Sequence, residues 1–228
     1  MSDEAIRRRV MDSPSRVENL GGEVIYDVTQ DHDPLLPGIT VCVATHPARF
    51  RNGLLTRALA SIAAQTLQPE MILASNDTGR QGAGWNRQNL LGQVRTEWTA
   101  WLDSDDEWKP EHLEKLMRTA TETDSVWVFS WYESVMDPLG HFGLPFNPCT
   151  PHHTTMNILE RTDIAQEVGF PDSSRHGGFS NEDWAHITGF AKICCERDLK
   201  MTHLAERTWT YHMGHGNSSG LPGQGDAT

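Results

Sequence analysis

Short apolar runs and amphipathic segments alternate along the chain between residues 39 and 133. Four runs rich in β-branched and aromatic residues predict buried strands, at 39–45, 71–75, 98–102 and 125–133. Three segments between them predict helices, at 52–67, 86–94 and 111–120; the first carries apolar residues at helical spacing, and Pro110 opens the third. Strands that alternate with helices indicate βαβ units. We therefore expect a single α/β domain, with a mostly parallel central sheet and helices on both faces.

The pattern is less regular after residue 135. Residues 181–194 predict a helix that presents Trp184, Ile187 and Phe190 on one side, and the run 201–213 predicts a last strand.

The two ends of the chain differ in composition from the part between them. Residues 1–38 are mostly polar and predict an N-terminal extension with a short helix and a strand at 24–28. Residues 218–228 are rich in Gly and Ser and predict a flexible tail. The regular part then divides into a first half at 39–135 and a second half at 136–217.

A formal net charge of −12, from 31 acidic and 19 basic residues, narrows the range of partners. It argues against general nucleic-acid binding, because phosphate backbones attract basic surfaces. The mean hydropathy is −0.51, and no run approaches the roughly 18 consecutive apolar residues of a membrane span. The first residues lack the apolar core of a secretory signal. We therefore expect a soluble protein of the cytoplasm.

The four cysteines, Cys42, Cys149, Cys194 and Cys195, form no C-x-x-C pair, and two of them are adjacent. This spacing suits neither a zinc ribbon nor a disulfide framework. We therefore expect reduced thiols, as is usual in the cytoplasm.

Polar residues follow three of the predicted strands, at Thr45–Arg49, Asn76–Asp77 and Asp103–Asp106. In open α/β sheets, ligands bind beyond the carboxyl ends of the strands. These three strand ends belong to consecutive βα units, so we expect them to converge on one site.

The sharpest chemical signal is the acidic run WLDSDDEW, in which Asp103 and Asp105 can share a face at the strand end. Clustered carboxylates repel one another, and a hard divalent cation relieves that repulsion. The competing interpretation is a solvated acidic turn before the helix that Pro110 opens. The acidic run by itself leaves both interpretations open.

Four motifs occur in order: ITVCVATHPAR, SIAAQTLQPEMILASNDTG, GWNRQNLL and TAWLDSDDEWKPEHLEKL. Together, over 39–116, they closely resemble the nucleotide-sugar-binding half of family-2-type glycosyltransferases with the Rossmann-like GT-A fold. The resemblance implies that 39–135 binds the nucleotide sugar and that 136–217 binds the acceptor.

The resemblance assigns the nucleotide pocket to the first two strand ends. Thr45 and Arg49 would line this pocket. Asp77 would accept a hydrogen bond from the base, expected to be uracil, with Asn76 as the alternative.

The same resemblance assigns the diphosphate side of the pocket. Arg87 would contact the nucleotide or its diphosphate. Asp103 and Asp105 would form the D-x-D pair, with Asp103 nearer the ribose and Asp105 nearest a bound Mn²⁺ or Mg²⁺.

The segment VGFPDSSRHGGFSNEDWAHITGFAKI resembles, more loosely, the acceptor side of these enzymes. Asp183 is then the expected catalytic base and Glu182 the alternative, while simple capping of the helix is the competing interpretation. The ending YHMGH implies a histidine that reaches the metal or the diphosphate, either His215, which we favour, or His212.

The resemblance implies a metal-dependent, inverting transfer of one sugar from a UDP-linked donor to an acceptor hydroxyl. A sugar nucleotidyltransferase is an alternative, although its Gly-rich phosphate loop should follow the first strand and only Gly53 stands there. A catalytically inactive nucleotide-sugar-binding module is another. The sequence leaves open the donor sugar, the acceptor, the choice between Mn²⁺ and Mg²⁺, and the oligomeric state.

Overall fold

A computed structural model describes residues 34–47, 49, 53–79, 81–133, 140–171 and 182–212 of the 228-residue chain. Apart from Pro34, all of them belong to the unit Leu35–Thr228. The strand expected at 24–28 and the tail expected at 218–228 lie outside the described residues.

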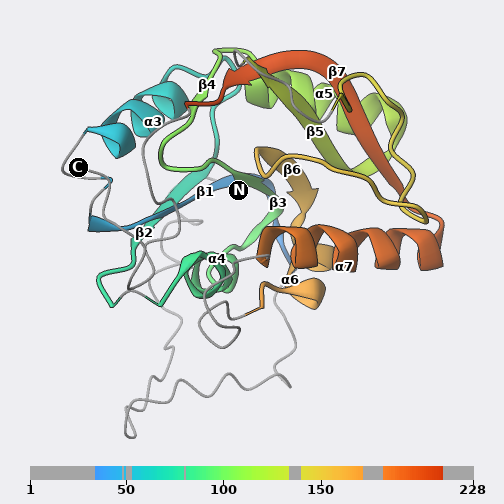
Figure 1. The fold of residues 1–228 in the computed structure, drawn as a ribbon, viewed down its shortest axis with the longest axis horizontal. Coiled ribbons are helices and arrows are strands. Elements are labelled where there is room, and N and C mark those ends of the chain that lie inside the picture. The colour runs from blue at the N-terminus through green and yellow to red at the C-terminus, as the bar shows by residue number, and fades with distance from the viewer. Residues whose placement is uncertain are drawn as a thin grey trace, which may run out of the picture. The chain divides into compact units, whose positions relative to one another are not determined.

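The described residues form one seven-stranded sheet, with the strand order β2-β1-β3-β6-β5-β7-β4 (Figure 1). The strands are β1 (Leu36–Thr45), β2 (Met71–Asn76), β3 (Thr96–Trp101), β4 (Glu107–Trp108), β5 (Ser125–Glu133), β6 (Ile158–Arg161) and β7 (Lys200–Thr210). Strand β1 is parallel to β2 and β3, and β5 is parallel to β7. The short strands β4 and β6, which the sequence did not predict, add three antiparallel pairings. The α/β class is confirmed, and the sheet is mixed.

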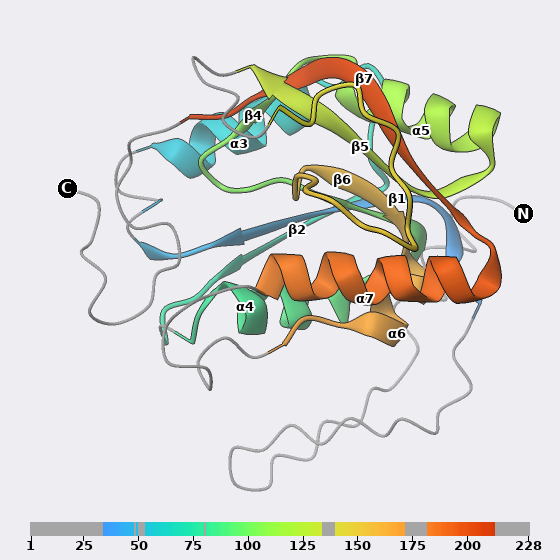
Figure 2. The same ribbon diagram turned by 45° about the vertical axis from the view of Figure 1, so that its right-hand side comes forward.

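Helices cover both faces of the sheet, as expected. Figures 1 and 2 show α4, α6 and α7 on one side of the sheet and α3 and α5 on the other. Their bounds are α3 (Leu54–Ala63), α4 (Ala83–Leu91), α5 (His112–Thr123), α6 (Thr162–Val168) and α7 (Glu182–Arg197).

Local patterning explains these elements. The middle of β1 is buried on both of its sides because helices cover both faces there, which accounts for the unbroken apolar run Val41–Val43. Strand β2 lies at the edge of the sheet and leaves Met71 and Ile72 exposed. Helix α3 buries one stripe, which includes Leu55 and Ile62.

The three large side chains expected on one side of α7 differ in exposure. Ile187 and Phe190 are buried, whereas 38% of Trp184 is exposed. At roughly 100° per residue, Trp184 lies about 120° from Phe190 around the helix, outside the buried stripe.

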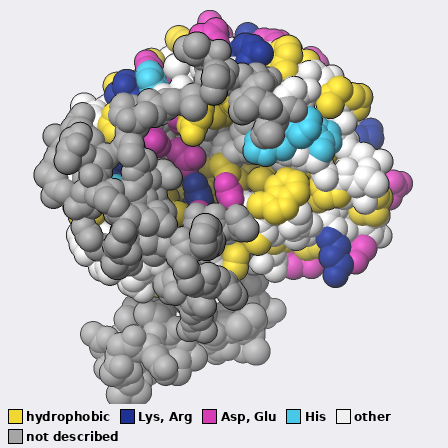
Figure 3. Space-filling model, in the orientation of Figure 1, with side chains coloured by type: hydrophobic (Ala, Val, Ile, Leu, Met, Phe, Trp, Pro, Cys, Tyr) yellow, Lys and Arg dark blue, Asp and Glu magenta, His cyan; other side chains and the backbone are white. Residues whose placement is uncertain are grey.

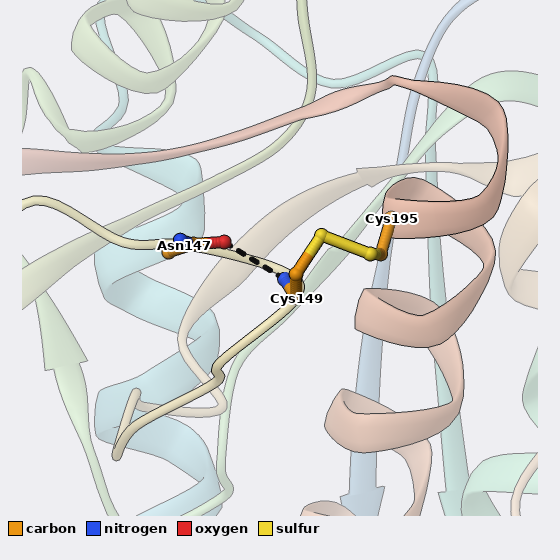
Figure 4. Close-up of a disulfide and its surroundings, with 3 residues drawn as sticks. All are labelled: Asn147, Cys149 and Cys195. Atoms are coloured by element: carbon orange, nitrogen blue, oxygen red, sulfur yellow. Dashed lines mark hydrogen bonds between the residues drawn. A yellow bond between two sulfur atoms is a disulfide. The ribbon is translucent and has the colours of Figure 1, made fainter.

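The expectation of four reduced thiols was wrong. Cys149 and Cys195 form a disulfide, with a Cα–Cα distance of 5.0 Å (Figure 4). This bond ties the segment after residue 140 to the last turn of α7, while Cys42 and Cys194 remain free and buried. The two bonded residues are 46 positions apart, so only tertiary structure brings them together. None of the described helices is long and apolar enough to cross a membrane.

Candidate active site

A polar cleft opens beyond the carboxyl ends of β1 and β3, beside the first turns of α4 and α7. Figure 3 shows acidic and basic side chains gathered around a hollow on this face. The lining residues come from all of these elements: Ala44, Thr45, His46, Arg49, Asp77, Gly82, Ala83, Asn86, Arg87, Asp103, Ser104, Asp105, Glu182, Asp183 and Tyr211. The three polar strand ends therefore do meet in one place.

Asp77 organises the loop between β2 and α4. Its Oδ1 accepts a hydrogen bond from the backbone N–H of Gln81 at 2.9 Å, and its Oδ2 accepts one from Gly82 at 2.7 Å. Gly82 has φ +99°, a backbone conformation that favours glycine. The alternative residue, Asn76, is exposed and does not line the cleft.

Asn86 is a part of the cleft that sequence reasoning missed. Its amide nitrogen donates to the carbonyl of Thr45 at 2.9 Å, and its side-chain oxygen contacts Ser75 Oγ. Asn86 thereby ties the ends of β1 and β2 to α4. The sequence carried a signal, because the helix at 83–91 has no continuous apolar stripe and contains the polar pair Asn86 and Arg87, which the structure buries.

Arg49 forms an ion pair with one member of the D-x-D pair. Its Nη1 lies 2.5 Å from Asp105 Oδ2, and the two side chains are 2% and 15% exposed. Arg49 Nε also donates to His46 Nε2 at 3.3 Å. Burial raises the pKa of Asp105, and the charge of Asp103 raises it further, against the opposing effect of Arg49.

Arg87 bridges the other Asp of the pair to α7. It donates to Asp103 Oδ1 at 2.7 Å and to Glu182 Oε1 at 2.8 Å. Burial disfavours its charge, but the carboxylates of Asp103, Glu182 and Asp183 outweigh burial and raise the pKa of Arg87. Arg87 is thus the central cation of the cleft wall.

Gly84 allows this bridge to form. A Cβ at this position would lie 2.2 Å from the carbonyl oxygen of Pro171 and 3.0 Å from Glu182 Cβ. Glycine allows α4 to lie this close to the Pro171 backbone and the start of α7.

The two consecutive carboxylates at the start of α7 have different surroundings. Glu182 is 4% exposed and paired with Arg87. Asp183 is half-buried and lines the cleft, and its Oδ1 accepts the backbone N–H of Trp184 at 2.7 Å. Burial raises the pKa of Asp183, while Arg87 opposes this shift and Glu182 adds to it.

Two buried oxygens at the cleft have no hydrogen-bond partner among the described residues. They are Thr45 Oγ1 and Glu182 Oε2. Buried polar atoms are nearly always satisfied in native proteins, so each of these two oxygens has room for a further hydrogen bond.

The acidic run presents two of its carboxylates to the cleft. Asp103 and Asp105 line the cleft, whereas Asp106 turns inward and accepts a hydrogen bond from Asn157 Nδ2 at 3.0 Å. In the described part of the chain, no three His, Cys, Asp or Glu side chains are arranged to hold a metal ion. Mg²⁺, however, is usually held by one or two carboxylates together with substrate phosphates. Asp103 and Asp105 fit that smaller requirement.

The structure describes only one of the two candidate histidines. His215 lies outside the described residues. His212 Nε2 lies 3.3 Å from Glu107 Oε2, and the backbone N–H of His212 donates to Asp106 Oδ1 at 3.3 Å. His212 is not among the residues that line the cleft.

Comparisons with known proteins find a matching family and similar folds. Residues 55–180 match the family described as glycosyl transferase family 2. The fold is similar to the crystal structure of S. aureus TarS 1–349 in complex with UDP-GlcNAc, with a TM-score of 0.63 and 17% identity over 79% of this chain and 60% of that one.

Two further TarS structures are similar. The complex of TarS 1–349 with UDP has a TM-score of 0.60 and 16% identity over 76% of this chain and 60% of that one. Another S. aureus TarS structure has a TM-score of 0.61 and 15% identity over 77% of this chain and 36% of that one. The chain therefore spans at most about three fifths of these relatives. A comparison with curated protein sequences finds no significant match.

Proposed function

This chain belongs to glycosyl transferase family 2, and from that premise we propose that it moves one sugar from a UDP-linked donor to the hydroxyl of an acceptor. The observation that carries the proposal is the cleft itself, which places the D-x-D carboxylates, two buried arginines and a half-buried aspartate around one hollow. The similar fold of TarS, whose structures hold UDP and UDP-GlcNAc, supports UDP as the carrier.

Residues 39–135 supply the donor side in this proposal. Thr45 and Arg49 line the nucleotide pocket. Asp77 accepts a hydrogen bond from the base with the acceptor capacity it retains, while the two backbone N–H groups of Gln81 and Gly82 hold its carboxylate in place. Arg87 lies beside the diphosphate as a fixed positive charge, where its ion pairs with Asp103 and Glu182 hold it.

A divalent cation, Mn²⁺ or Mg²⁺, fits at Asp103 and Asp105, with His215 as a further candidate ligand. When bound, it supplies Lewis-acid neutralisation of the charge that develops on the leaving diphosphate.

Asp183 is the catalytic base of the proposed reaction, and residues 136–217 supply the acceptor side. Asp183 takes the proton of the acceptor hydroxyl while that oxygen forms a bond to the anomeric carbon. The bond between the anomeric carbon and the diphosphate oxygen breaks, and UDP leaves with the electron pair. A single displacement of this kind inverts the anomeric configuration.

The test is release of UDP from a panel of UDP-sugars by the purified full chain with Mn²⁺ or Mg²⁺. We expect release for at least one sugar and its loss after chelation, since even slow transfer to water frees UDP. Binding of UDP-sugar with no release in any condition would identify an inactive binding module. Release of UTP from UDP-sugar and pyrophosphate would identify a nucleotidyltransferase instead.

A thermal-shift measurement tests the cation separately. At a UDP concentration of ~100 times Kd, binding should stabilise the fold by about 2.7 kcal/mol. Equal stabilisation by UDP with and without a chelator would remove the cation from the donor site.

The cytoplasmic location stays a prediction. The Cys149–Cys195 bond weighs against it, because both residues are exposed and glutathione keeps accessible thiols reduced in that compartment. Alkylation of thiols in freshly lysed cells gives the answer. Alkylation of Cys149 and Cys195 would show reduced thiols and support a cytoplasmic location. Protection of both residues by the disulfide would contradict that location.

A further inference from the structure

A pair of fully buried ionisable side chains lies behind the cleft, on β6 and α7. Glu160 and His186 are both 0% exposed, and His186 Nε2 lies 2.9 Å from Glu160 Oε2. On its other side, His186 Nδ1 lies 2.8 Å from the carbonyl oxygen of Gly169. A carbonyl can only accept, so Nδ1 carries a proton, and a second proton lies in the bond between Nε2 and Oε2. Neither side chain lines the cleft.

This pair continues into the strand that carries the D-x-D motif. The second oxygen of Glu160 accepts a hydrogen bond from Trp101 Nε1 at 2.6 Å. Trp101 ends β3, two residues before Asp103. Phe170 stacks on the imidazole of His186, with a centroid distance of 4.0 Å, and fixes the plane of the ring. A continuous chain of hydrogen bonds thus runs from β3 through Glu160 to α7.

A second link runs along the cleft wall, from the turn just after β3 through Arg87 of α4 to α7. Asp103, Arg87 and Glu182 form it through contacts of 2.7 and 2.8 Å. Glu182 and His186 are four residues apart and therefore lie one turn apart along one side of α7. A helix held at two points one turn apart can neither slide nor rotate freely against β3. Asp183 lies between these two points in the sequence.

Stability alone does not account for a buried ionisable pair. Replacing such a pair with apolar side chains of similar volume is often neutral or stabilising, whereas removing one partner is costly. The reaction rate is much more sensitive than stability to such a change, because a misplacement of a reacting group by about 1 Å can lower the rate by about 10²-fold.

We propose that Glu160 and His186 are positioning residues that hold α7 in register with β3, so that Asp183 meets the acceptor hydroxyl at the donor's anomeric carbon. This inference rests on the proposed function. Because the pair contacts β3 and α7 and not the cleft, its loss should lower kcat and leave the affinity for UDP unchanged.

The experiment compares three variants of the full chain. Glu160→Met with His186→Leu replaces the pair with apolar side chains of similar volume. Glu160→Gln keeps every link, because the amide oxygen can accept from Trp101 while the amide N–H donates to a neutral His186. Thr99→Val with Thr162→Val is the matched control, since these two fully buried hydroxyls, 2.8 Å apart, join β3 to α6 instead of α7.

The measurements are the melting temperature, the Kd for UDP and the rate of UDP release. We expect the double variant Glu160→Met with His186→Leu, called the Met/Leu variant, to fold and to bind UDP with a Kd within about threefold of that of the wild type. Its kcat should be at least tenfold lower. We expect Glu160→Gln and the threonine control to keep kcat within about threefold, whatever their melting temperatures. Wild-type kcat in a folded Met/Leu variant would overturn the proposal, and so would a tenfold loss in the threonine control. If the Met/Leu variant does not fold, a tenfold loss of kcat in folded Glu160→Gln overturns it.

Hydrogen exchange at residues 182–188 separates this inference from the proposed function. Faster exchange there in the Met/Leu variant, with wild-type exchange in Glu160→Gln, supports the positioning role even if the wild type releases no UDP. Unchanged exchange in both variants contradicts it. Absence of UDP release from the wild type counts against the proposed function alone.

Discussion

At the scale of single residues, Glu182 and Asp183 show how environment separates two chemically similar groups. Glu182 is paired with Arg87, whereas Asp183 is half-buried at the cleft with a raised pKa that burial causes. We expect Asp183→Asn to lower kcat by the ~10²–10⁴-fold typical of removing a general base. The Kd for UDP should stay the same, because the base contacts the acceptor. Steady-state kinetics and UDP titration of the variant measure both.

Glu182→Gln is the companion variant. It weakens the ion pair with Arg87, so we expect lower stability and a smaller loss of kcat than Asp183→Asn causes. If Glu182→Gln abolishes turnover while Asp183→Asn does not, the base is Glu182. Asp183→Asn should leave the melting temperature unchanged, since Asn and Asp are similarly favourable at the start of a helix.

His112 predicts a pH dependence of stability. It is fully buried, stacks on Trp108 and contacts Thr208 Oγ1 through Nδ1 at 2.6 Å. Burial lowers the pKa of His112 to about 3, from about 6.5 in the unfolded chain. Between these values the unfolded chain binds more protons, so the free energy of unfolding falls as the pH drops from 6.5 towards 3. Between pH 7 and pH 5 the loss should be about 2 kcal/mol, at ~1.4 kcal/mol per pH unit below the unfolded pKa.

Urea unfolding at the two pH values measures this loss, and His112→Leu is the control that removes the titrating group. The variant should lose about 2 kcal/mol less than the wild type over the same interval. An identical change in both proteins would show that other groups govern the dependence.

At the scale of elements, the packing of α4 against Pro171 and the start of α7 depends on a single missing Cβ. In Gly84→Ala, the new methyl group would meet the carbonyl of Pro171, and backbone cannot yield as a flexible side chain can. We expect a loss of about 1–3 kcal/mol in stability, the usual cost of overpacking. Turnover should fall as well, because the displaced helices carry Arg87 and Glu182.

Gly92, at the C-terminal end of the same helix, offers the matched control. It follows α4 with φ −62°, and a Cβ there would lie 3.5 Å from Gln88 O, an ordinary contact. Gly92→Ala should therefore leave stability unchanged or raise it by about 0.4–1 kcal/mol. Chemical unfolding of both variants tests the pair, and equal destabilisation would contradict the close approach of α4 and α7.

At the scale of the whole molecule, the disulfide joins parts of the chain that are 46 residues apart. Cross-linking a loop of this length typically stabilises a protein by about 2–4 kcal/mol, through the lost freedom of the unfolded chain. We expect Cys149→Ser with Cys195→Ser to lower the free energy of unfolding by this amount. The kcat should not change, because Cys195 lies in the last turn of α7 and Asp183 in the first.

Reduction of the wild type provides the internal check. Dithiothreitol should bring its unfolding midpoint to that of the double variant and leave the variant unaffected. A wild type that is insensitive to reductant, with no accessible disulfide by mass spectrometry, would refute the pairing.

The sequence by itself determined the repeating strands and helices and the places where polar groups follow a strand. Hydrophobic periodicity is a local property, and a parallel arrangement brings the carboxyl ends of neighbouring strands to one edge, so Thr45, Asp77 and Asp103 could be placed together in advance. The motifs then identified the family. Short elements such as β6 and α6 gave too few residues for a periodic signal.

Only the tertiary structure decided which of these groups act on one another. Arg87 meets Glu182 across 95 residues, and Cys149 meets Cys195 across 46. Local patterns carry no information about such pairs, because their partners are chosen by how the helices pack on the sheet. The different surroundings of Glu182 and Asp183 arise in the same way. Side chains that are neighbours in sequence point in directions about 100° apart on a helix. Only the packing of α4 against α7 shows that Glu182, and not Asp183, is the one that faces α4.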